Sequence, residues 1–378
     1  MRWIAMVSLI GALVIHAGET ASKAAFELGF AGLPIVKIKL LAKDGSSKEL
    51  RMVVDTGSSI TVLDRTVGAE YWKEDGKGAL AQGSSGGTME AEPVVLYQLQ
   101  FGPWIMNRVQ GIRLDLNEFN AVEDIPVNGI LGMNVLRSGP FRLDFAAREV
   151  VWGGKPSGAY LRDLSYTRLG LPILELEVAG KRIDALCDTG SNECLDLSDQ
   201  DAEKLRTATD RRSSGGQVAL GGLPGIEAVI ALKAKPVSAG TRSWCDPEVL
   251  FRRGTQDSKI GVRAMWPDIW FDFHKNQIGF ALSQRGCIES RPAIKAPIFA
   301  YWDRRGSKAK IRVGGVKPGS SYESAGLKPG DVLLEVGAAK GDALNLATLR
   351  QALTEKGTLK VVFERRGQIR SIEVPPTK

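Results

Sequence analysis

The sequence predicts a mostly β protein, built from two related β lobes and a small α+β module at the C-terminal end. Two observations predict the lobes. Short segments alternate apolar and polar residues in period two, as in LPIVKIKL and LPILELEV, and the tetrapeptide Asp-Thr-Gly-Ser occurs once in each half. A third observation separates the tail, which combines strand-like segments with helix signals. We therefore expect lobes at residues 26–156 and 160–286 and a further domain at 296–378.

The composition is that of a folded globular protein with room for two or three cores. The chain has 378 residues, of which 43% are hydrophobic and 25% are charged. Its net charge of +7 is unevenly distributed, because residues 291–378 hold 17 Lys and Arg against 8 Asp and Glu, whereas residues 1–290 hold 33 against 35. The basic tail suggests anionic partners. No aromatic-and-basic motif accompanies the charge, so we expect no binding to nucleic acid.

Residues 1–21 have the pattern of a secretory signal peptide. A single Arg is followed by an apolar stretch from Ile4 to Ile15 and then by small and polar residues. This stretch is too short to cross a hydrocarbon core of about 30 Å, which needs about 20 residues. We expect cleavage near residues 17–21, export to the periplasm or the extracellular space, and no stable membrane span in the mature chain.

The four cysteines are Cys187, Cys194, Cys245 and Cys287. An exported chain can form disulfides, and four cysteines allow three pairings, of which we favour Cys245 with Cys287. No C-x-x-C motif occurs, which disfavours a zinc or redox site. Cys187 and Cys194 are consistent with small buried apolar residues.

The two predicted lobes are related by an internal duplication. Asp55 corresponds to Asp188, and GILGMNVLRSGPFRLDFAAREVVW (129–152) corresponds to KIGVRAMWPDIWFDFHKNQIGF (259–280). Equivalent lobes around an approximate two-fold axis would bring both Asp-Thr-Gly turns to that axis. Two adjacent carboxylates do not both ionise easily, so they would share one proton and act as acid and base on a water molecule. A turn-capping aspartate is the simpler interpretation of one motif alone, and the duplication disfavours it.

These elements resemble the aspartic proteases of the pepsin and retropepsin kind, in the bilobal single-chain form, over about residues 30–285. Three features match in each lobe: the Asp-Thr-Gly-Ser turn, a glycine-bearing stretch at the position of the family's flap, and an apolar-apolar-Gly segment. The flap stretches are AQGSSGGTME (81–90) and SSGGQVALGGLPG (213–225). The third feature is ILG (130–132) in the first lobe, whereas the second lobe departs from the pattern with KIG (259–261).

The resemblance implies that Asp55 and Asp188 hold the water that attacks the peptide bond. It also implies that the threonines bond across the lobe interface, that the glycines donate N–H groups to the carboxylates, and that the serines bond the outer carboxylate oxygens. These supporting residues are Thr56, Gly57, Ser58, Thr189, Gly190 and Ser191. Flap glycines, namely Gly83, Gly86 and Gly87, would close over a polypeptide substrate in the inter-lobe cleft. No metal or cofactor is required, and both half-sites lie in one chain, which predicts a monomer.

The tail resembles a PDZ domain of the bacterial protease-associated type. The resemblance rests on AGLKPGDVLLEV (325–336) and on NLATLRQALTEKG (345–357), in which Asn345 can cap a helix and Gly357 can end it. It implies that a C-terminal peptide binds as an added strand, between a strand at 310–316 and a helix at 346–355. The groove residues would be Lys310, Ile311, Val313, Leu346 and Leu349. A rigid accessory domain without a ligand is the alternative.

Other hydrolase classes lack the residues that they need. The chain has two histidines, of which His16 lies in the predicted signal and His274 in a predicted hairpin turn. A Ser-His-Asp triad and an H-E-x-x-H zinc site are therefore both excluded. We predict an exported aspartic endopeptidase with a PDZ domain for substrate recruitment or regulation. The alternative is a catalytically inactive, protease-like peptide-binding or scaffold protein that presents the PDZ domain.

Overall fold

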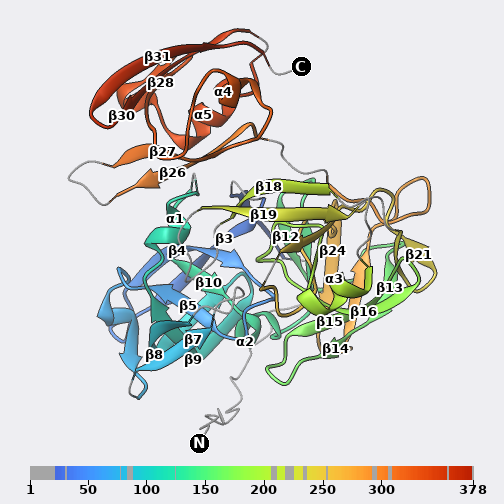
Figure 1. Cartoon of the computed structure of the whole chain (residues 1–378). Helices are drawn as coiled ribbons and strands as arrows, with labels where there is room; N and C mark the ends of the chain where they lie inside the picture. The colour runs from blue at the N-terminus through green and yellow to red at the C-terminus, as the bar shows by residue number, and fades with distance from the viewer. Residues whose placement is uncertain are drawn as a thin grey trace, which may run out of the picture.

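The chain folds into two β lobes and a β-rich tail, shown in the computed structural model of Figure 1. The structure describes residues 22–376 except for 30–31, 77, 83–87, 124, 206–210, 218–224, 233–235, 253, 292–295, 305–308 and 356. In Figure 1 the first lobe runs from blue to green, the second from green to orange, and the tail from orange to red. The prediction of a mostly β fold is confirmed. Within the described residues, every helix falls short of the length and apolar character that a membrane span requires.

A single twisted sheet forms the first lobe, in the order β2-β3-β4-β10-β5-β9-β8-β6, with β7 paired to β8. In β3 the apolar residues Val36, Ile38 and Leu40 are buried while Lys37 and Lys39 between them are exposed, as the period-two pattern predicts. The strands are β2 (Glu27–Leu28), β3 (Pro34–Leu41), β4 (Ser47–Val54), β5 (Thr61–Asp64), β6 (Trp72–Glu74), β7 (Ala79–Gln82), β8 (Thr88–Phe101), β9 (Trp104–Leu114) and β10 (Gly129–Leu131). The helical turns are η1 (Ala69–Tyr71), α1 (Asn117–Asn120) and α2 (Met133–Leu136).

The second lobe repeats the topology of the first, in the order β18-β19-β22-β17-β23-β16-β15-β20-β21, with β14 paired to β15. Its strands are β14 (Ser165–Tyr166), β15 (Pro172–Val178), β16 (Lys181–Cys187), β17 (Leu195–Leu197), β18 (Arg211–Gln217), β19 (Gly225–Leu232), β20 (Val237–Ala239), β21 (Arg242–Ser243), β22 (Val249–Arg252) and β23 (Lys259–Ile260), and its helix is α3 (Asp199–Leu205). Strand β10 lies parallel to β4 and antiparallel to β5, and β23 lies parallel to β16 and antiparallel to β17. The duplicated sequence thus folds as a duplicated structure.

A third sheet joins the two lobes, in the order β1-β12-β11-β24-β25-β13. Its strands are β1 (Lys23–Ala25), β11 (Phe141–Asp144), β12 (Glu149–Trp152), β13 (Tyr160–Asp163), β24 (Asp268–Asp272) and β25 (Gln277–Phe280). Strands β11 and β24 are equivalent segments of the two repeats and pair antiparallel, with Phe141 opposite Phe271. The centroids of the two rings lie 5.4 Å apart. Both rings belong to one hydrophobic core that extends through both lobes. This pairing places an approximate two-fold axis between the repeats.

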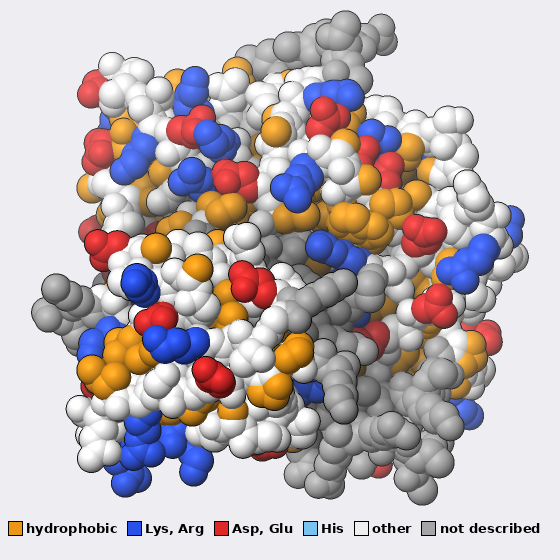
Figure 2. Space-filling model, turned by 90° about the horizontal axis from the view of Figure 1, so that it is seen from above, with side chains coloured by type: hydrophobic (Ala, Val, Ile, Leu, Met, Phe, Trp, Pro, Cys, Tyr) orange, Lys and Arg blue, Asp and Glu red, His pale blue; other side chains and the backbone are white. Residues whose placement is uncertain are grey.

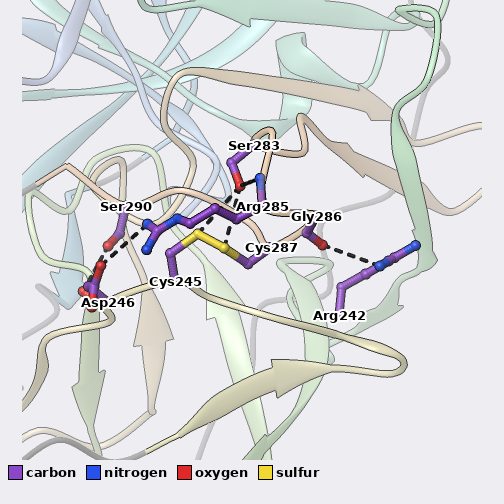
Figure 3. Close-up of a disulfide and its surroundings, with 8 residues drawn as sticks. All are labelled: Arg242, Cys245, Asp246, Ser283, Arg285, Gly286, Cys287 and Ser290. Atoms are coloured by element: carbon purple, nitrogen blue, oxygen red, sulfur yellow. Dashed lines mark hydrogen bonds and ion pairs between the residues drawn. A yellow bond between two sulfur atoms is a disulfide. The ribbon is translucent and has the colours of Figure 1, made fainter.

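One disulfide closes the end of the second lobe. Cys245 and Cys287 are bonded, with their Cα atoms 5.3 Å apart, so the favoured pairing is confirmed. Figure 3 shows polar contacts on both sides of the bridge, including the hydrogen bond from Ser290 to the carbonyl of Asp246. Cys187 and Cys194 are free and buried, as expected. Burial raises the pKa of the Cys194 thiol to about 11, so it is an inert part of the core.

The tail forms its own sheet and its own core. The sheet order is β26-β27-β28-β30-β31, with β29 on β28. The elements are β26 (Ile298–Asp303), β27 (Lys310–Val316), α4 (Ser321–Ser324), β28 (Val332–Val336), β29 (Ala339–Lys340), η2 (Gly341–Ala343), α5 (Leu346–Ala352), β30 (Leu359–Arg365) and β31 (Gln368–Val374). Asn345 caps α5, as predicted, through a reciprocal capping box with Thr348. The helix ends at Ala352, earlier than predicted, because the Thr354 amide bonds the carbonyl of Gln351 in a tighter turn.

The prediction that the strand at residues 310–316 accepts a peptide is wrong. Strand β27, which carries Lys310, Ile311 and Val313, pairs with β26 on one side and with β28 on the other. A strand with two neighbours has no free edge to accept another strand. The outer strand is β26, which has a described partner on one side only.

Local ion pairs balance part of the basic charge of the tail. Acidic partners lie within 3.4 Å of basic groups in four pairs. These pairs are Lys310–Glu364, Arg312–Asp303, Lys360–Glu335 and Arg365–Asp331. Figure 2, which views the molecule from above, shows blue and red side chains next to one another over most of the face.

Candidate active site

Both Asp-Thr-Gly turns begin where an interior strand of a lobe ends. Asp55 follows β4, and Asp188 follows β16. The apolar-Gly strand of each lobe continues the ladder past this point, because the Asp55 amide bonds the carbonyl of Leu131 at 3.0 Å and the Asp188 amide bonds that of Ile260 at 2.9 Å. The two aspartates are thus fixed by equivalent backbone contacts, one in each lobe.

The two threonines lock the turns together across the lobe interface. The Thr56 amide donates to Oγ1 of Thr189 and the Thr189 amide donates to Oγ1 of Thr56, both at 3.0 Å. Each hydroxyl then donates to a strand of the opposite lobe: Thr56 to the carbonyl of Cys187 at 2.5 Å, and Thr189 to that of Val54 at 2.7 Å. Both threonines are completely buried, so all four hydrogen bonds are shielded from water.

The glycines bring the two carboxyls face to face. The Gly57 amide donates to Oδ1 of Asp55 at 2.8 Å, and the Gly190 amide donates to Oδ1 of Asp188 at 2.9 Å. A Cβ atom added to Gly57 would lie 2.5 Å from Oδ1 of Asp188, and one added to Gly190 would lie 2.5 Å from Oδ1 of Asp55. Only glycine leaves room for the opposite carboxyl at these positions. The predicted meeting of the two carboxyls at the interface is therefore present in the structure.

The paired carboxyls favour a state that holds one proton. Part of Asp55 remains exposed, but the surrounding protein desolvates its carboxyl, and this raises its pKa well above the ordinary value. The negative charge of Asp188 raises it further, and a hydrogen bond between the carboxyls acts in the same direction. Such a pair can take a proton from water and give a proton to a carbonyl in the same step.

The serines do not bond the carboxylates as expected. The Ser58 hydroxyl donates to the carbonyl of Ile60 at 2.8 Å, and the Ser191 hydroxyl accepts from the Glu193 amide at 3.5 Å. A serine in a turn finds backbone partners two residues away, and such local bonds compete with longer-range ones. Among the described contacts, neither hydroxyl reaches an aspartate.

A lysine beside the dyad was missed by the sequence analysis. Lys259 lies on β23, and its Nζ is 3.9 Å from Oδ2 of Asp188. The available signal was the charged first residue of KIG (259–261), where the first lobe has ILG (130–132). As a motif this lysine is a departure from the pattern, whereas in the structure its side chain points toward the dyad.

A β hairpin occupies the predicted flap position of each lobe. In the first lobe β7 pairs with β8, from Gln82 opposite Thr88 onward, and in the second lobe β18 pairs with β19. The predicted flap glycines Gly83, Gly86 and Gly87 lie outside the described residues. Beneath the first hairpin, Ala81 and Met89 pack on a small apolar cluster separate from the main core. That cluster consists of Val62, Ala91, Leu114, Leu116 and Ile130.

The predicted peptide site of the tail is only partly assembled as expected. Leu346 and Leu349 lie on α5 as predicted, and both are buried. The outer strand beside α5 is β26 rather than β27. The first lobe contacts both elements, because the Trp302 amide of β26 bonds the carbonyl of Ala121 at 2.7 Å and Nη2 of Arg350 on α5 bonds that of Val122 at 2.8 Å.

Comparison with known proteins supports the class of protein that this geometry defines. Residues 38–135 match the family model described as aspartyl protease. The matched segment runs from β3 to α2 and contains Asp55 and the ILG strand (130–132). No curated protein matches the chain. The match supports an aspartic protease, and a turn of the second lobe supplies the other carboxyl of the pair.

Proposed function

We propose that this chain is an exported aspartic endopeptidase, which hydrolyses peptide bonds with a water molecule held between Asp55 and Asp188. The observation that carries the proposal is the contact of each carboxyl with the glycine of the opposite turn. This contact needs both lobes and both aspartates. An aspartate that only caps a turn would need no second lobe and no second aspartate.

The chemistry follows from a pair that holds one proton. The ionised carboxyl takes a proton from the water, the oxygen of which attacks the scissile carbonyl carbon. The protonated carboxyl donates its proton to the carbonyl oxygen. The proton taken from water then passes to the leaving amine as the C–N bond breaks. The raised pKa of Asp55 supports this mechanism, since it keeps a proton on the pair at a pH where an ordinary aspartic acid has lost it.

The substrate would be an extended polypeptide in a cleft between the lobes. The β7–β8 hairpin, which packs on the apolar cluster around Ile130, would cover such a chain. Backbone hydrogen bonds would hold the peptide, and apolar side chains beneath the hairpin would select among substrates. The enzyme would act as a monomer, because one chain supplies both aspartates. It would act in the periplasm or the extracellular space, to which the signal-like residues 1–21 would direct it.

The tail would act as a PDZ domain for substrate recruitment or regulation. The outer strand β26 beside α5 is the edge at which a C-terminal peptide would add. The present contacts of β26 with Ala121 and of α5 with Val122 favour regulation, since a bound peptide and the first lobe would compete for the same edge. A peptide-cleavage assay of the chain with and without residues 290–378 separates the two roles. Loss of recruitment would lower the rate of cleavage, whereas loss of restraint would raise it.

The test of the enzyme is cleavage of a mixed peptide library with and without a statine-type inhibitor. We expect inhibitor-sensitive cuts, and a loss of kcat/KM of at least about 100-fold in Asp55→Asn and in Asp188→Asn, because each removes an acid–base group. Asp246→Asn is the matched control, since its side chain is 85% exposed, and it should cleave normally. Substantial cleavage by Asp188→Asn would reject the dyad.

The same assay decides the second candidate, a catalytically inactive protein that binds peptides or serves as a scaffold. That alternative predicts retention of library peptides without cuts, at every enzyme concentration and pH. The intact Asp-Thr-Gly-Ser turns of both lobes favour the enzyme.

A further inference from the structure

The two lobes differ in charge at one pair of equivalent positions. In the first lobe Ile130 of β10 lies opposite Val62 of β5. In the second lobe Lys259 of β23 lies opposite Asp196 of β17. An apolar pair is thus replaced by a lysine and an aspartate at the strand next to the catalytic turn.

Among the described ion pairs, Lys259 joins one aspartate of the dyad, Asp188. Its positive charge also lowers the pKa of Asp55, as the smallest of the effects on that carboxyl. Its Nζ is 3.9 Å from Oδ2 of Asp188, and the two side chains are 13% and 12% exposed. Across the axis, the equivalent Ile130 is part of the apolar cluster beneath the hairpin and brings no charge to Asp55. A charge interaction at this distance is weakly screened by salt, because water has little access to it.

Few other charges face this pair among the described residues. Asp55 faces Asp188 across the axis, and Asp196 lies on the strand beside Lys259. The Cys187 thiol precedes Asp188 and is neutral, because burial raises its pKa far above the ordinary value. Arg263 is engaged by Glu193 and Glu248, at 3.5 and 2.7 Å. Among the residues that the structure describes, Lys259 is therefore the cation that acts on the dyad.

We propose that Lys259 is a positioning residue that holds the negative charge of the resting dyad on Asp188 and leaves its proton on Asp55. This inference rests on the proposed function and adds the role of each carboxyl. Asp188 takes the proton from water, and the remaining hydroxide bonds to the carbonyl carbon while Asp55 protonates the carbonyl oxygen. Asp188 then gives its proton to the amine nitrogen, the C–N bond breaks, and a hydroxyl proton of the intermediate returns to Asp55. The raised pKa of Asp55 agrees with this assignment.

The pH profile of kcat/KM tests the role of the lysine. In Lys259→Met the ionised form of the dyad loses its cation, so the acid limb should move to higher pH by about one unit, which lowers kcat/KM about tenfold on the acid side. Lys259→Arg keeps the charge and should keep the wild-type limb. Ile130→Met is the matched control of the first lobe, which should leave the limb in place whatever it does to the rate.

A titration that needs no substrate tests the assignment in the wild-type protein. Carboxyl ¹³C signals of Asp-labelled protein, assigned with Asp55→Asn and Asp188→Asn, should show Asp188 losing its proton first. If Asp55 loses its proton first, or if the acid limb of the pH profile does not move in Lys259→Met, the inference about Lys259 is overturned. Neither result contradicts the catalytic role of the two aspartates. Absence of cleavage by the wild type defeats the proposed function, and the titration still decides the charge assignment.

Discussion

At the scale of single residues, Asp55 and Asp188 occupy equivalent turns in unlike surroundings. Lys259 lies beside Asp188, whereas the equivalent neighbour of Asp55 is Ile130. Burial and the charge of Asp188 raise the pKa of Asp55 above its value in the unfolded chain. The folded protein therefore binds a proton more tightly than the unfolded chain, and stability falls as the pH rises from the ordinary pKa to the raised one. The dyad costs stability at the pH where its ionisation is needed.

This cost predicts that Asp55→Asn stabilises the protein at neutral pH. The amide is neutral at every pH, so the variant should match the wild type near pH 3 and melt a few degrees higher above the raised pKa. Melting curves between about pH 3 and 8 measure the difference. Asp246→Asn, at an exposed position, should follow the wild type throughout. A variant that is less stable than the wild type at neutral pH would show that the Asp55 carboxyl stabilises the fold when ionised.

The residues of the dyad could be predicted from the sequence, but some of their neighbours could not. Two copies of Asp-Thr-Gly-Ser at matching places in a repeat are sufficient to pair Asp55 with Asp188. The hydroxyl of Ser58 chooses between a carboxylate and a backbone carbonyl by small differences in rotamer and distance, which a motif does not contain. Likewise, the sequence shows that Lys259 breaks an apolar pattern but not the direction in which its long side chain points.

At the scale of elements, the interlocked threonines hold the two turns in register. Each threonine accepts from the other's amide and donates to a carbonyl of the opposite lobe. A valine at either position would leave buried N–H and C=O groups without partners, which costs more than the bond itself contributes. The network therefore couples the stability of the lobe interface to the geometry of the dyad.

A double-mutant cycle of Thr56→Val and Thr189→Val measures this coupling. Each single change should cost about 1–3 kcal/mol in urea unfolding, because buried groups lose their partners. The double change should cost less than the sum by about 0.5–3 kcal/mol, since both act on one network. Thr56→Ser and Thr189→Ser keep the hydroxyls and serve as controls. Additive costs would mean that the threonines act independently.

The existence of most elements was predictable, whereas the neighbours of one strand were not. Period-two alternation identifies β3 and β15, and the capping signal at Asn345 identifies the start of α5. The position of β27 between β26 and β28 depends on pairing between segments distant in the sequence. Local propensity contains no information on which strand lies outermost, so the peptide edge was assigned to the wrong strand.

At the scale of the whole molecule, two kinds of contact join its parts. The lobes share the β11–β24 pairing and a common hydrophobic core, which makes the body one cooperative unit. The tail has its own core, and its described hydrogen bonds to the first lobe run from Trp302 to Ala121 and from Arg350 to Val122. Ala121 and Val122 are each 6% exposed. The duplication predicts the first kind of contact, but nothing in the sequence pairs α5 with residues 121–122.

Arg350→Ala should release the tail from the first lobe. A hydrogen bond from a charged donor contributes about 1.5–3 kcal/mol, so hydrogen exchange at the amides of residues 121–123 and of Trp302 should accelerate by roughly tenfold or more. Exchange in β28 and β30, within the tail core, should stay unchanged. Arg370→Ala is the control, because Arg370 is exposed and its described bond is to Gln368 on its own strand. Equal protection in the two variants would mean that Arg350 does not hold the tail against the lobe. Faster exchange in Arg350→Ala, together with an altered cleavage rate, would connect tail docking to control of the dyad.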